Sequence, residues 1–323
     1  MMRAAVLSPD GSVTVQDVEP PVPAANQVLV RVRAAGLNRA DLMARAGTGQ
    51  TGPAIAGLEF AGEVEAVGAQ VSRWRAGDKV MGRGSGFAEL AVMHEADAIR
   101  VPAGLSWEEA GAMPVTLLTA HDALVTNGRL TPGELVVVNA GSSGVGICAA
   151  RMAGILGAGA VVSATTSGSK VAAIRDAVGP LPCPIVVVEV SGDDFVAAVR
   201  SQSDDGQGAH LIIDNVGASV LGDNMAAARV TGRIVQVGRL GGRRSEIDLD
   251  ELARKRLTLV GVTFRTRSLA EGAEVVRRCL ADLGDQLGRL GPRIDQAFSL
   301  GQILDARAAM QRNQHVGKIV VVP

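Results

Sequence analysis

The chain has 323 residues, which at roughly 150 residues per domain suggests about two domains with well-buried cores. Hydrophobic residues make up 47% and charged residues 20%, a composition that excludes an intrinsically disordered chain. The formal net charge is −1, so no overall positive field would recruit nucleic acid or an anionic membrane, and we expect neither as a partner.

Apolar stretches and cysteines narrow the class further. No apolar run reaches the roughly 18–20 residues of a transmembrane helix. A Pro-Asp-Gly turn at residues 9–11 comes too early for the apolar region of a signal peptide, so we expect a cytoplasmic protein. The three cysteines, Cys148, Cys183 and Cys279, are odd in number and far apart, which argues against a disulfide framework and against structural zinc.

The first third of the chain predicts a β domain. Apolar and polar residues alternate in four segments separated by glycine and proline: VLVRVRAAG from residue 28, EFAGEVEAVG from residue 59, DKVMG and FAELAVM. This pattern predicts a barrel-like antiparallel domain. Helical spacing then begins at Ser106, an N-cap candidate with Glu109 at capping-box distance, and continues to Val125.

From Gly133 onward, apolar strands alternate with amphipathic helices. Strands such as ELVVVNAG and AHLIIDNVG are continuous apolar runs, which is typical of parallel sheets covered by helices on both faces. We therefore predict an α/β fold in which residues 117–263 form a Rossmann-type doubly wound domain. Residues 1–116 form the β domain, and residues 264–323 return to complete it.

The stretch VVVNAGSSGVGICAA, from Val136, joins the end of a buried strand to a glycine turn and a helix start. In this arrangement backbone N–H groups and the positive helix end bind a pyrophosphate. The GxxGxG spacing differs from the GxGxxG fingerprint, so the context rather than the spacing supports a nucleotide site. We predict that Ser142, Ser143, Gly144 and Val145 bind a dinucleotide. The alternative is a glycine-rich turn with no ligand.

The end of the second parallel strand indicates which dinucleotide binds. An NAD site usually has a carboxylate there, about 20 residues after the glycine turn, which holds the ribose 2′-hydroxyl. The sequence instead has Thr165, Thr166, Ser167, Ser169 and Lys170. Hydroxyl donors and one ammonium group suit a 2′-phosphate, so we expect NADPH. The alternative is that the serine caps the next helix while the lysine lies in solvent.

At this point the sequence resembles the zinc-free quinone oxidoreductase branch of the medium-chain dehydrogenase/reductase superfamily. Seven strings carry the resemblance, in family order along nearly the whole chain: GLNRADLMARAG, PAIAGLEFAGEVEAVG, AGDKVMG, MPVTLLTAHDAL, NAGSSGVG, IIDNVG and RNQHVGKIVVV. The resemblance implies a GroES-like catalytic domain followed by a Rossmann domain. It also implies a homodimer, with a late strand such as LTLVGVTF as one candidate for the contact, although the pattern of this strand fits a buried interior equally well.

The resemblance implies roles for Asn38 and Asp41. Zinc alcohol dehydrogenases of this superfamily have a Cys ligand where Asn38 stands and a His where Leu58 stands, so no metal site is expected here. By similarity, Asn38 would hydrogen-bond the nicotinamide ribose, and Asp41 would orient the local backbone or an arginine such as Arg45. Capping of the helix RADLMAR by Asn38 is compatible with that contact, and capping alone is the alternative for Asp41.

Further cofactor contacts follow from the resemblance. Those expected are Thr119 near the phosphates, Thr165, Ser169 and Lys170 at the 2′-phosphate, Asn215 and Gly238 along the cleft, Phe264 near the nicotinamide, and Lys318 in the closing string NQHVGK. Without the resemblance, Thr119 would be read as an ordinary helix residue, Phe264 as a core residue and Lys318 as a strand residue. Met43 and Val190 stand where relatives often have tyrosine, and the chain contains no tyrosine.

These features predict a zinc-independent oxidoreductase that transfers hydride from NADPH to a quinone or a related activated carbonyl acceptor. Because no phenol is present, the proton would come from water, a cofactor ribose hydroxyl or a histidine. One alternative is reduction of an enoyl or alkenal double bond. Another is a non-catalytic NADPH-binding redox sensor. A zinc alcohol dehydrogenase is nearly excluded by the missing Cys and His.

Overall fold

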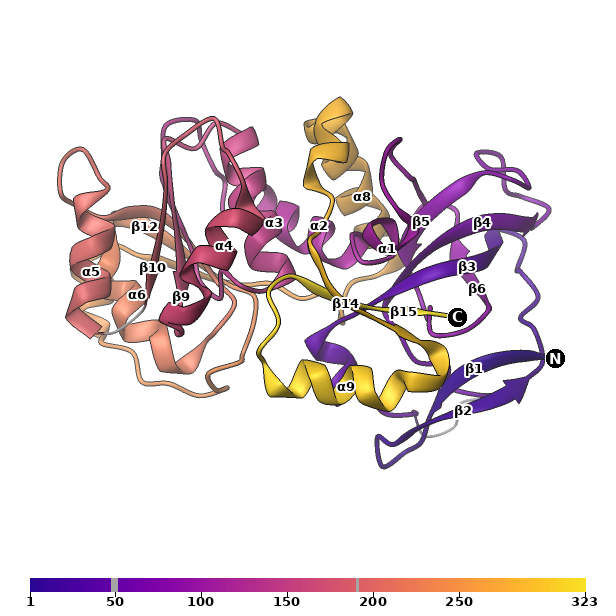
Figure 1. Ribbon diagram of the computed structural model, residues 1–323. Coiled ribbons are helices and arrows are strands. Elements are labelled where there is room, and N and C mark those ends of the chain that lie inside the picture. Colours follow the sequence, from indigo (N-terminus) through magenta and orange to yellow (C-terminus); the bar gives the residue numbers. More distant parts are fainter. Residues whose placement is uncertain (48–51, 190–191) are drawn as a thin grey trace. The chain divides into compact units, whose positions relative to one another are not determined.

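The computed structural model describes residues 1–47, 52–189 and 192–323, so Val190 lies outside the described residues. Contacts between Cα atoms divide the chain into two compact units (Figure 1). The first consists of Met1–Thr116 and Gly272–Pro323, and the second of Leu117–Glu271. The first unit is therefore built from both ends of the chain.

The first unit contains the GroES-like β domain. Its seven-stranded sheet has the order β14-β15-β3-β4-β5-β7, with β6 also paired to β3. All pairs are antiparallel except β14 with β15. A separate hairpin joins β1 (Met2–Leu7) to β2 (Val13–Val18). The other strands are β3 (Gln27–Leu37), β4 (Glu59–Val67), β5 (Lys79–Arg83), β6 (Leu90–His94), β7 (Ile99–Arg100), β14 (Ile294–Ser299) and β15 (Lys318–Val322).

Short helices complete this unit. They are η1 (Arg39–Met43), α1 (Trp107–Gly111), the C-terminal part of α8 (Leu269–Leu283), η5 (Gly284–Leu290), η6 (Leu300–Gln302) and α9 (Ile303–Arg312). The core consists of alternate strand residues together with the buried face of α9, which includes Ile303, Ala306 and Met310. Strand alternation read from the sequence thus corresponds to the buried face of the sheet.

The helical stretch predicted from Ser106 is divided in three. The capping box is confirmed, because the Ser106 N–H donates to Glu109 and the Glu109 N–H donates back to Ser106 Oγ. Helix α1 ends before Pro114, where a new helix, α2 (Pro114–His121), begins. Proline lacks an N–H and disfavours helical geometry in the preceding residue, but it suits a first helical position. A π-helical turn, η2 (Asp122–Asn127), follows.

The second unit is a Rossmann-type domain. All pairs in its six-stranded sheet are parallel, and the strand order is β10-β9-β8-β11-β12-β13. The direction of winding reverses between β8 and β11, which is the position where dinucleotides bind in such sheets. The strands are β8 (Leu135–Val138), β9 (Ala160–Thr165), β10 (Ile185–Glu189), β11 (Ala209–Asp214), β12 (Ala228–Gln236) and β13 (Thr258–Gly261).

Helices cover both faces of this sheet (Figure 1). Helix α3 packs against α4, and α5 packs against α6. The helices are α3 (Gly144–Ile155), η3 (Gly168–Lys170), α4 (Val171–Val178), α5 (Gly192–Ser201), η4 (Ala218–Val220), α6 (Leu221–Ala227) and α7 (Leu249–Lys255). Helix α6 ends at Ala227, because β12 already begins at Ala228. Strand β13 lies at the sheet edge, where the predicted dimer contact would extend.

Among the described residues, no helix is both long and apolar enough to cross a membrane.

Candidate functional site

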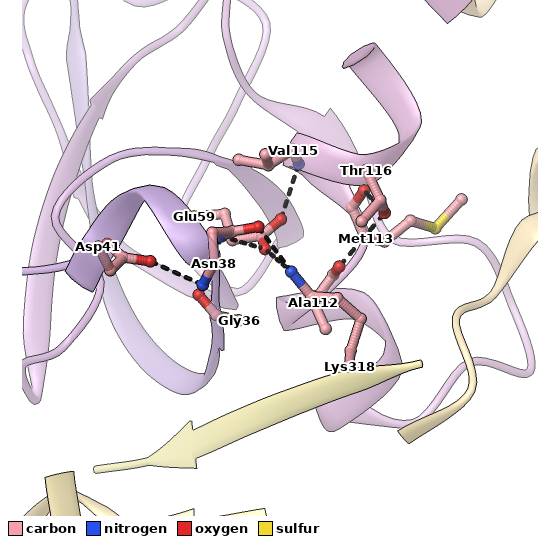
Figure 2. A network of polar contacts seen from close by, with 9 residues as sticks. All are labelled: Gly36, Asn38, Asp41, Glu59, Ala112, Met113, Val115, Thr116 and Lys318. Atoms are coloured by element: carbon pink, nitrogen blue, oxygen red, sulfur yellow. Dashed lines mark hydrogen bonds and ion pairs between the residues drawn. The ribbon is translucent and has the colours of Figure 1, made fainter. Parts of the chain in front are cut away.

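A buried carboxylate organises the polar residues of the first unit (Figure 2). Glu59, the first residue of β4, is fully buried and accepts three hydrogen bonds. Its Oε1 accepts from Asn38 Nδ2 at 2.8 Å and from Lys318 Nζ at 2.7 Å. Its Oε2 accepts from the backbone N–H of Val115 at 2.7 Å, so the first turn of α2 also faces the negative charge. Glu59 thus joins β4, β15, α2 and the loop after β3.

Asn38 and Lys318 complete this cluster. Lys318 Nζ donates to Asn38 Oδ1 at 2.8 Å as well as to Glu59, and Figure 2 shows the lysine reaching both from β15. Asn38 Nδ2 also donates to the carbonyl oxygen of Gly36 at 3.3 Å. Asn38 occupies the predicted N-cap position, but these side-chain hydrogen bonds go to Gly36, Glu59 and Lys318. Close packing requires glycine at residue 36, since a Cβ there would lie 2.3 Å from Glu59 Oε1.

Asp41 lies beside this cluster and is itself buried, with 2% of its surface exposed. Its Oδ2 accepts from the Asn38 backbone N–H at 2.7 Å, while its buried Oδ1 has no partner among the described residues. Burial is the main cause that raises the pKa of Asp41 to about 7, and the Asn38 N–H opposes this rise. Asp41 therefore contacts the backbone of Asn38 through a hydrogen bond that belongs to a capping box, which agrees with both readings of this residue.

A different arginine from the predicted one contacts Asp41. Arg307 of α9 donates from Nη1 to the Asp41 carbonyl oxygen at 2.9 Å. Arg45 instead donates to the backbone carbonyl oxygen of Asp10, next to the β1–β2 turn. Sequence proximity suggested Arg45, whereas the C-terminal return of the chain brings Arg307 to the site.

In the second unit, the glycine turn after β8 opens directly onto α3. Ser143 is the N-cap, its Oγ accepting from the Gly146 N–H at 3.0 Å and donating to the Ala140 carbonyl oxygen at 2.8 Å. No protein acceptor within residues 1–47, 52–189 and 192–323 takes the N–H groups of Ser142, Gly144 or Val145. Three backbone donors at a helix N-terminus are thus open to an anion.

Glycine is required where this turn meets the sheet. A Cβ on Gly146 would lie 2.3 Å from the carbonyl oxygen of Ala140, and a Cβ on Gly141 would lie 2.1 Å from Ser163 Oγ. These contacts let α3 approach the strand ends closely. The turn thus fits the pyrophosphate of a dinucleotide, although the Ser143 hydroxyl is occupied by the cap.

The predicted 2′-phosphate residues lie in the segment after β9. Thr165 is buried and its Oγ1 accepts from the Ser167 N–H at 3.3 Å, while Ser167 Oγ and Ser169 Oγ lie 2.9 Å apart. Ser169 is exposed, and Lys170 ends η3 before α4 begins. The predicted capping by serine does not occur at α4, whose N-cap residue is Lys170.

A carboxylate from the neighbouring strand reaches this segment. Glu189 ends β10 and pairs in register with Thr165, the last residue of β9. A Cβ on Gly168 would lie 2.5 Å from Glu189 Oε2. The stretch after β9 contains no carboxylate, but the fold brings that of Glu189 to Gly168, two residues before Lys170.

Asn215 and Gly238 lie together at the same edge of the sheet. Asn215 Nδ2 donates to the carbonyl oxygen of Asn139 at 3.0 Å, which joins the end of β11 to the end of β8. A Cβ on Gly238 would lie 2.0 Å from the Asn215 carbonyl oxygen. Behind them, buried Asp214 accepts from the N–H groups of Val216 and Gly217. Burial raises the pKa of Asp214, and these two hydrogen bonds oppose the rise.

Thr119 and Phe264 are the remaining predicted residues, and both lie in the second unit. Thr119 is half-buried on α2, and Phe264 is half-buried in the segment after β13. Both belong to the second unit, whereas Asn38, Asp41 and Lys318 belong to the first. The predicted residues Asn38, Asp41 and Lys318 thus form a cluster in the first unit, and the other predicted residues belong to the second unit.

Two different protein families match the N-terminal part and the later part of the chain. Residues 24–103 match the alcohol dehydrogenase GroES-like domain family, and residues 144–280 match the zinc-binding dehydrogenase family. The synaptic vesicle membrane protein VAT-1 homolog of Homo sapiens is 31% identical over 330 residues, covering 94% of the chain and 81% of that protein. The chain spans 64% of the length of the Danio rerio homolog, at 30% identity. Quinone oxidoreductase-like protein 2 of Mus musculus is 28% identical over 95% of the chain and 88% of that protein.

Solved structures share the whole fold. A quinone oxidoreductase of Pseudomonas syringae pv. tomato superposes with a TM-score of 0.82 at 27% identity, covering 100% of both chains. A mycobacterial protein solved in complex with NADPH superposes with a TM-score of 0.84 at 24% identity, again over 100% of both chains, which shows the common fold. The chain belongs to the medium-chain dehydrogenase/reductase superfamily, in its quinone oxidoreductase branch. It is an oxidoreductase of that superfamily.

One family that matches this oxidoreductase is described as zinc-binding. The question is therefore whether the chain has side chains that could bind a zinc ion. At the two positions that correspond to zinc ligands by resemblance, it has the amide of Asn38 and the alkyl side chain of Leu58. Among the described residues, no three His, Cys, Asp or Glu side chains form a group that could hold a metal ion. The side chains at these positions therefore do not fit a catalytic zinc ion.

Sequence reasoning missed Glu59 and Glu189 in this oxidoreductase. Glu59 follows Leu58 in the string GLE, and a charged residue directly before the apolar residues Phe60 and Ala61 was an available signal. Glu189 had no comparable signal, because its importance comes only from the pairing of β10 with β9.

Proposed function

We propose that this protein is a zinc-independent oxidoreductase that transfers hydride from NADPH to a quinone or a related activated carbonyl acceptor. The observation that carries the proposal is the row of open donors at the start of α3. The N–H groups of Ser142, Gly144 and Val145 lie beside β8, where the winding of the sheet reverses. Donors at a helix N-terminus at this position suit a dinucleotide pyrophosphate.

The segment after β9 supports NADPH as the dinucleotide. Lys170 supplies a positive charge, while Thr165 and Ser169 supply hydroxyl groups at the end of the second strand. An ammonium group and hydroxyls favour a phosphate over a ribose hydroxyl. Glu189 opposes this preference, because its carboxylate would repel the same phosphate. The balance between Lys170 and Glu189 is thus the feature that sets the cofactor choice.

The dihydronicotinamide, when bound, supplies the hydride, and the side chains of the first unit orient and polarise. Lys318 uses two of its three N–H groups on Glu59 and Asn38, which leaves one for a ligand. Asn38 is held by hydrogen bonds to Gly36, Glu59 and Lys318, so its amide has a fixed orientation. Asp41 acts as a positioning residue through the Asn38 backbone N–H.

The absence of tyrosine favours quinones among the acceptors. Reduction of a quinone gives a stabilised hydroquinone anion, which solvent can protonate without a protein acid. Reduction of an alkenal or enoyl group gives an enolate, which gains more from a positioned proton donor or cation. The Lys318 ammonium group is a cation of this kind, and for this reason double-bond reduction is the second candidate activity.

The test is NADPH oxidation by purified, metal-stripped protein against a benzoquinone, an ortho-quinone, a 2-alkenal and an enoyl thioester, each repeated with NADH. We expect turnover without added zinc, faster with NADPH and with a quinone. Faster turnover of the alkenal or thioester would assign double-bond reduction instead. Tight NADPH binding without turnover of any acceptor would contradict the proposed activity and favour a redox sensor.

A variant tests the cofactor choice directly. Lys170→Ala should weaken NADPH binding about ten- to a hundredfold, or roughly 1.5–3 kcal/mol, because an ionic contact to the 2′-phosphate is lost. Titration of NADPH fluorescence measures the change, and NADH serves as the cofactor control. Arg175→Ala is the matched protein control, since Arg175 is an exposed cation on the adjacent helix α4. Unchanged NADPH affinity in Lys170→Ala would remove Lys170 from the site.

A further inference from the structure

A second buried carboxylate lies in the Rossmann-type unit, at the start of the π-helical turn η2. Asp122 is fully buried, and its Oδ2 accepts from Arg267 Nη2 at 2.6 Å and from Asn127 Nδ2 at 3.1 Å. Its Oδ1 is buried and has no partner among the described residues. A fully buried charge is stable only when it is paired, so the placement of Asp122 depends on Arg267.

The π-helical turn explains why Asp122 can present its carboxylate in this way. In η2 the N–H of Gly128 bonds to the carbonyl oxygen of Ala123, five residues back. Asn127 Nδ2 takes the carbonyl oxygen of Asp122 at 2.9 Å as well as its carboxylate. Single π-helical turns recur at functional sites because they redirect side chains.

Arg267 connects this turn to the segment after β13, residues 262–268. Its Nε donates to the carbonyl oxygen of Thr263 at 3.2 Å, and its guanidinium carbon lies 4.9 Å from the centre of the Phe264 ring. One planar guanidinium group therefore contacts a buried carboxylate, the backbone of its own segment and an aromatic ring. A displacement of Arg267 would therefore remove one contact of the Phe264 ring.

The other hydrogen bonds of this segment are mostly short-range. The Val262 N–H donates to the Gln236 carbonyl oxygen at 3.0 Å, at the end of the β12–β13 pair. Beyond it, the Arg265 N–H bonds to Thr263 Oγ1, within the segment itself. The ion pair with Asp122 joins residues 145 positions apart in sequence, so it fixes the segment to the body of the unit.

We propose that Arg267, held by Asp122, is a positioning residue that fixes Phe264 against the dihydronicotinamide ring. This inference rests on the proposed function and on the expectation from the resemblance that Phe264 lies near the nicotinamide. The pair holds the segment before the cofactor arrives, so that the ring meets a fixed aromatic surface. Loss of the pair should disturb hydride transfer more than cofactor binding, since the adenosine end binds at other residues.

The test compares five variants of the full chain. Arg267→Met removes the charge while keeping much of the length, and Asp122→Asn removes the buried carboxylate with little change in shape. The double variant closes a thermodynamic cycle. Arg265→Met is the matched control, because Arg265 is an exposed arginine in the same segment. Arg267→Lys is the conservative variant, which keeps the charge but not the planar fork.

Two readouts separate positioning from general stability. The first is the single-turnover rate of hydride transfer from NADPH to 1,4-benzoquinone, with the isotope effect of C4-deuterated NADPH. Arg267→Met and Asp122→Asn should each slow this step roughly ten- to a hundredfold, while the NADPH Kd changes less than about threefold. The double variant should be no slower than either single variant, and Arg267→Lys should recover part of the rate.

The second readout does not require turnover. Hydrogen exchange of amides 262–268 should accelerate in Arg267→Met and Asp122→Asn but not in Arg265→Met. If the wild-type protein reduces no acceptor, the proposed function fails, and accelerated exchange still supports the pair. Unchanged exchange, hydride transfer within about twofold of wild type in Arg267→Met, or equal slowing in Arg265→Met would each overturn the inference.

Discussion

The two units of the chain differ in whether the polar groups of their candidate sites already have hydrogen-bond partners. In the first unit, Glu59 is fully buried and accepts hydrogen bonds from Asn38, Lys318 and Val115. In the second, no acceptor within the described residues takes the N–H groups of Ser142, Gly144 and Val145 around the start of α3, and Ser169 is exposed after β9. The first cluster is largely complete without a ligand, whereas the second offers its donors outward.

The first cluster therefore holds side chains in fixed positions before a ligand binds, whereas the N–H groups in the second unit are suited to bind an anion. Burial of a charge costs desolvation energy even when the charge is paired, and loss of a partner costs more, so Glu59 holds Asn38 and Lys318 in fixed positions. Open donors at a helix end are stabilised by water until an anion displaces it. Changes in the first cluster should therefore be measured as stability, and changes in the second as cofactor affinity.

The largest expected effect is on the buried ion pair. Lys318→Met leaves Glu59 buried without its cation, and we expect a loss of about 3–5 kcal/mol in the free energy of unfolding. Urea unfolding followed by circular dichroism measures it. Arg31→Met is the matched control, because the Arg31–Glu65 pair has the same 2.7 Å distance but side chains that are 51% and 39% exposed. That control should cost less than about 1 kcal/mol.

The double variant Glu59→Gln with Lys318→Met sharpens this result. It removes both charges, so it should be more stable than Lys318→Met alone. Equal losses in Lys318→Met and Arg31→Met would contradict the contrast between the two clusters, because burial would then make no difference.

A smaller effect is expected from Asp41, and it depends on pH. The pKa of Asp41 is raised from 3.8 to about 7 in the folded protein, chiefly by burial. The folded state therefore binds the proton more tightly than the unfolded state. The resulting stability is fully present below about pH 4 and is lost as the pH rises towards 7. Asp41→Asn should remove this loss and gain about 3–4 kcal/mol over wild type at pH 8–9.

Unfolding midpoints between pH 4 and pH 9 measure this dependence. Asp10→Asn is an opposite control, because hydrogen bonds from Ser12 lower the pKa of exposed Asp10. That variant should lose a little stability at neutral pH and none at low pH. Parallel pH profiles for wild type and Asp41→Asn would show that Asp41 does not titrate in this range.

The fold could be predicted from sequence because its signals are local. Alternating apolar residues determined the buried face of the first sheet, and continuous apolar strands determined the parallel sheet. Ser106 and Glu109 predicted their capping box from a spacing of three residues. The division of the next helix at Pro114 was also readable from sequence, whereas the π-helical turn after His121 has no such pattern.

The candidate site was predictable only where one segment contains it. The turn at residues 141–146 is such a segment, and its helix end and close packing match the prediction. Glu59 becomes part of the first cluster through Lys318, which lies 259 residues away in sequence. Arg307 reaches Asp41 in the same way, across 266 residues, and replaces the expected Arg45. Such contacts follow from chain topology rather than from any local pattern.

The smallest expected effect concerns the carboxylate that β10 brings to the segment after β9. Glu189→Gln removes a negative charge near Gly168 and should tighten NADPH binding about three- to tenfold, since a partly solvated carboxylate repels the 2′-phosphate modestly. NADH binding should remain within about twofold. Fluorescence titration of both cofactors measures the change, and added salt should reduce the difference for NADPH.

Asp204→Asn is the control for this charge. Exposed Asp204 precedes β11 and therefore lies at the N-terminal ends of the parallel strands, opposite the ends that carry Glu189. Weaker NADH binding in Glu189→Gln, with NADPH unchanged, would reverse the assignment. The carboxylate would then hold ribose hydroxyls, as acidic residues do in NAD sites, and NADH would become the preferred cofactor. Tighter NADPH binding would instead mean that Lys170 attracts the phosphate despite a repelling neighbour, which identifies residue 189 as the position that tunes cofactor choice.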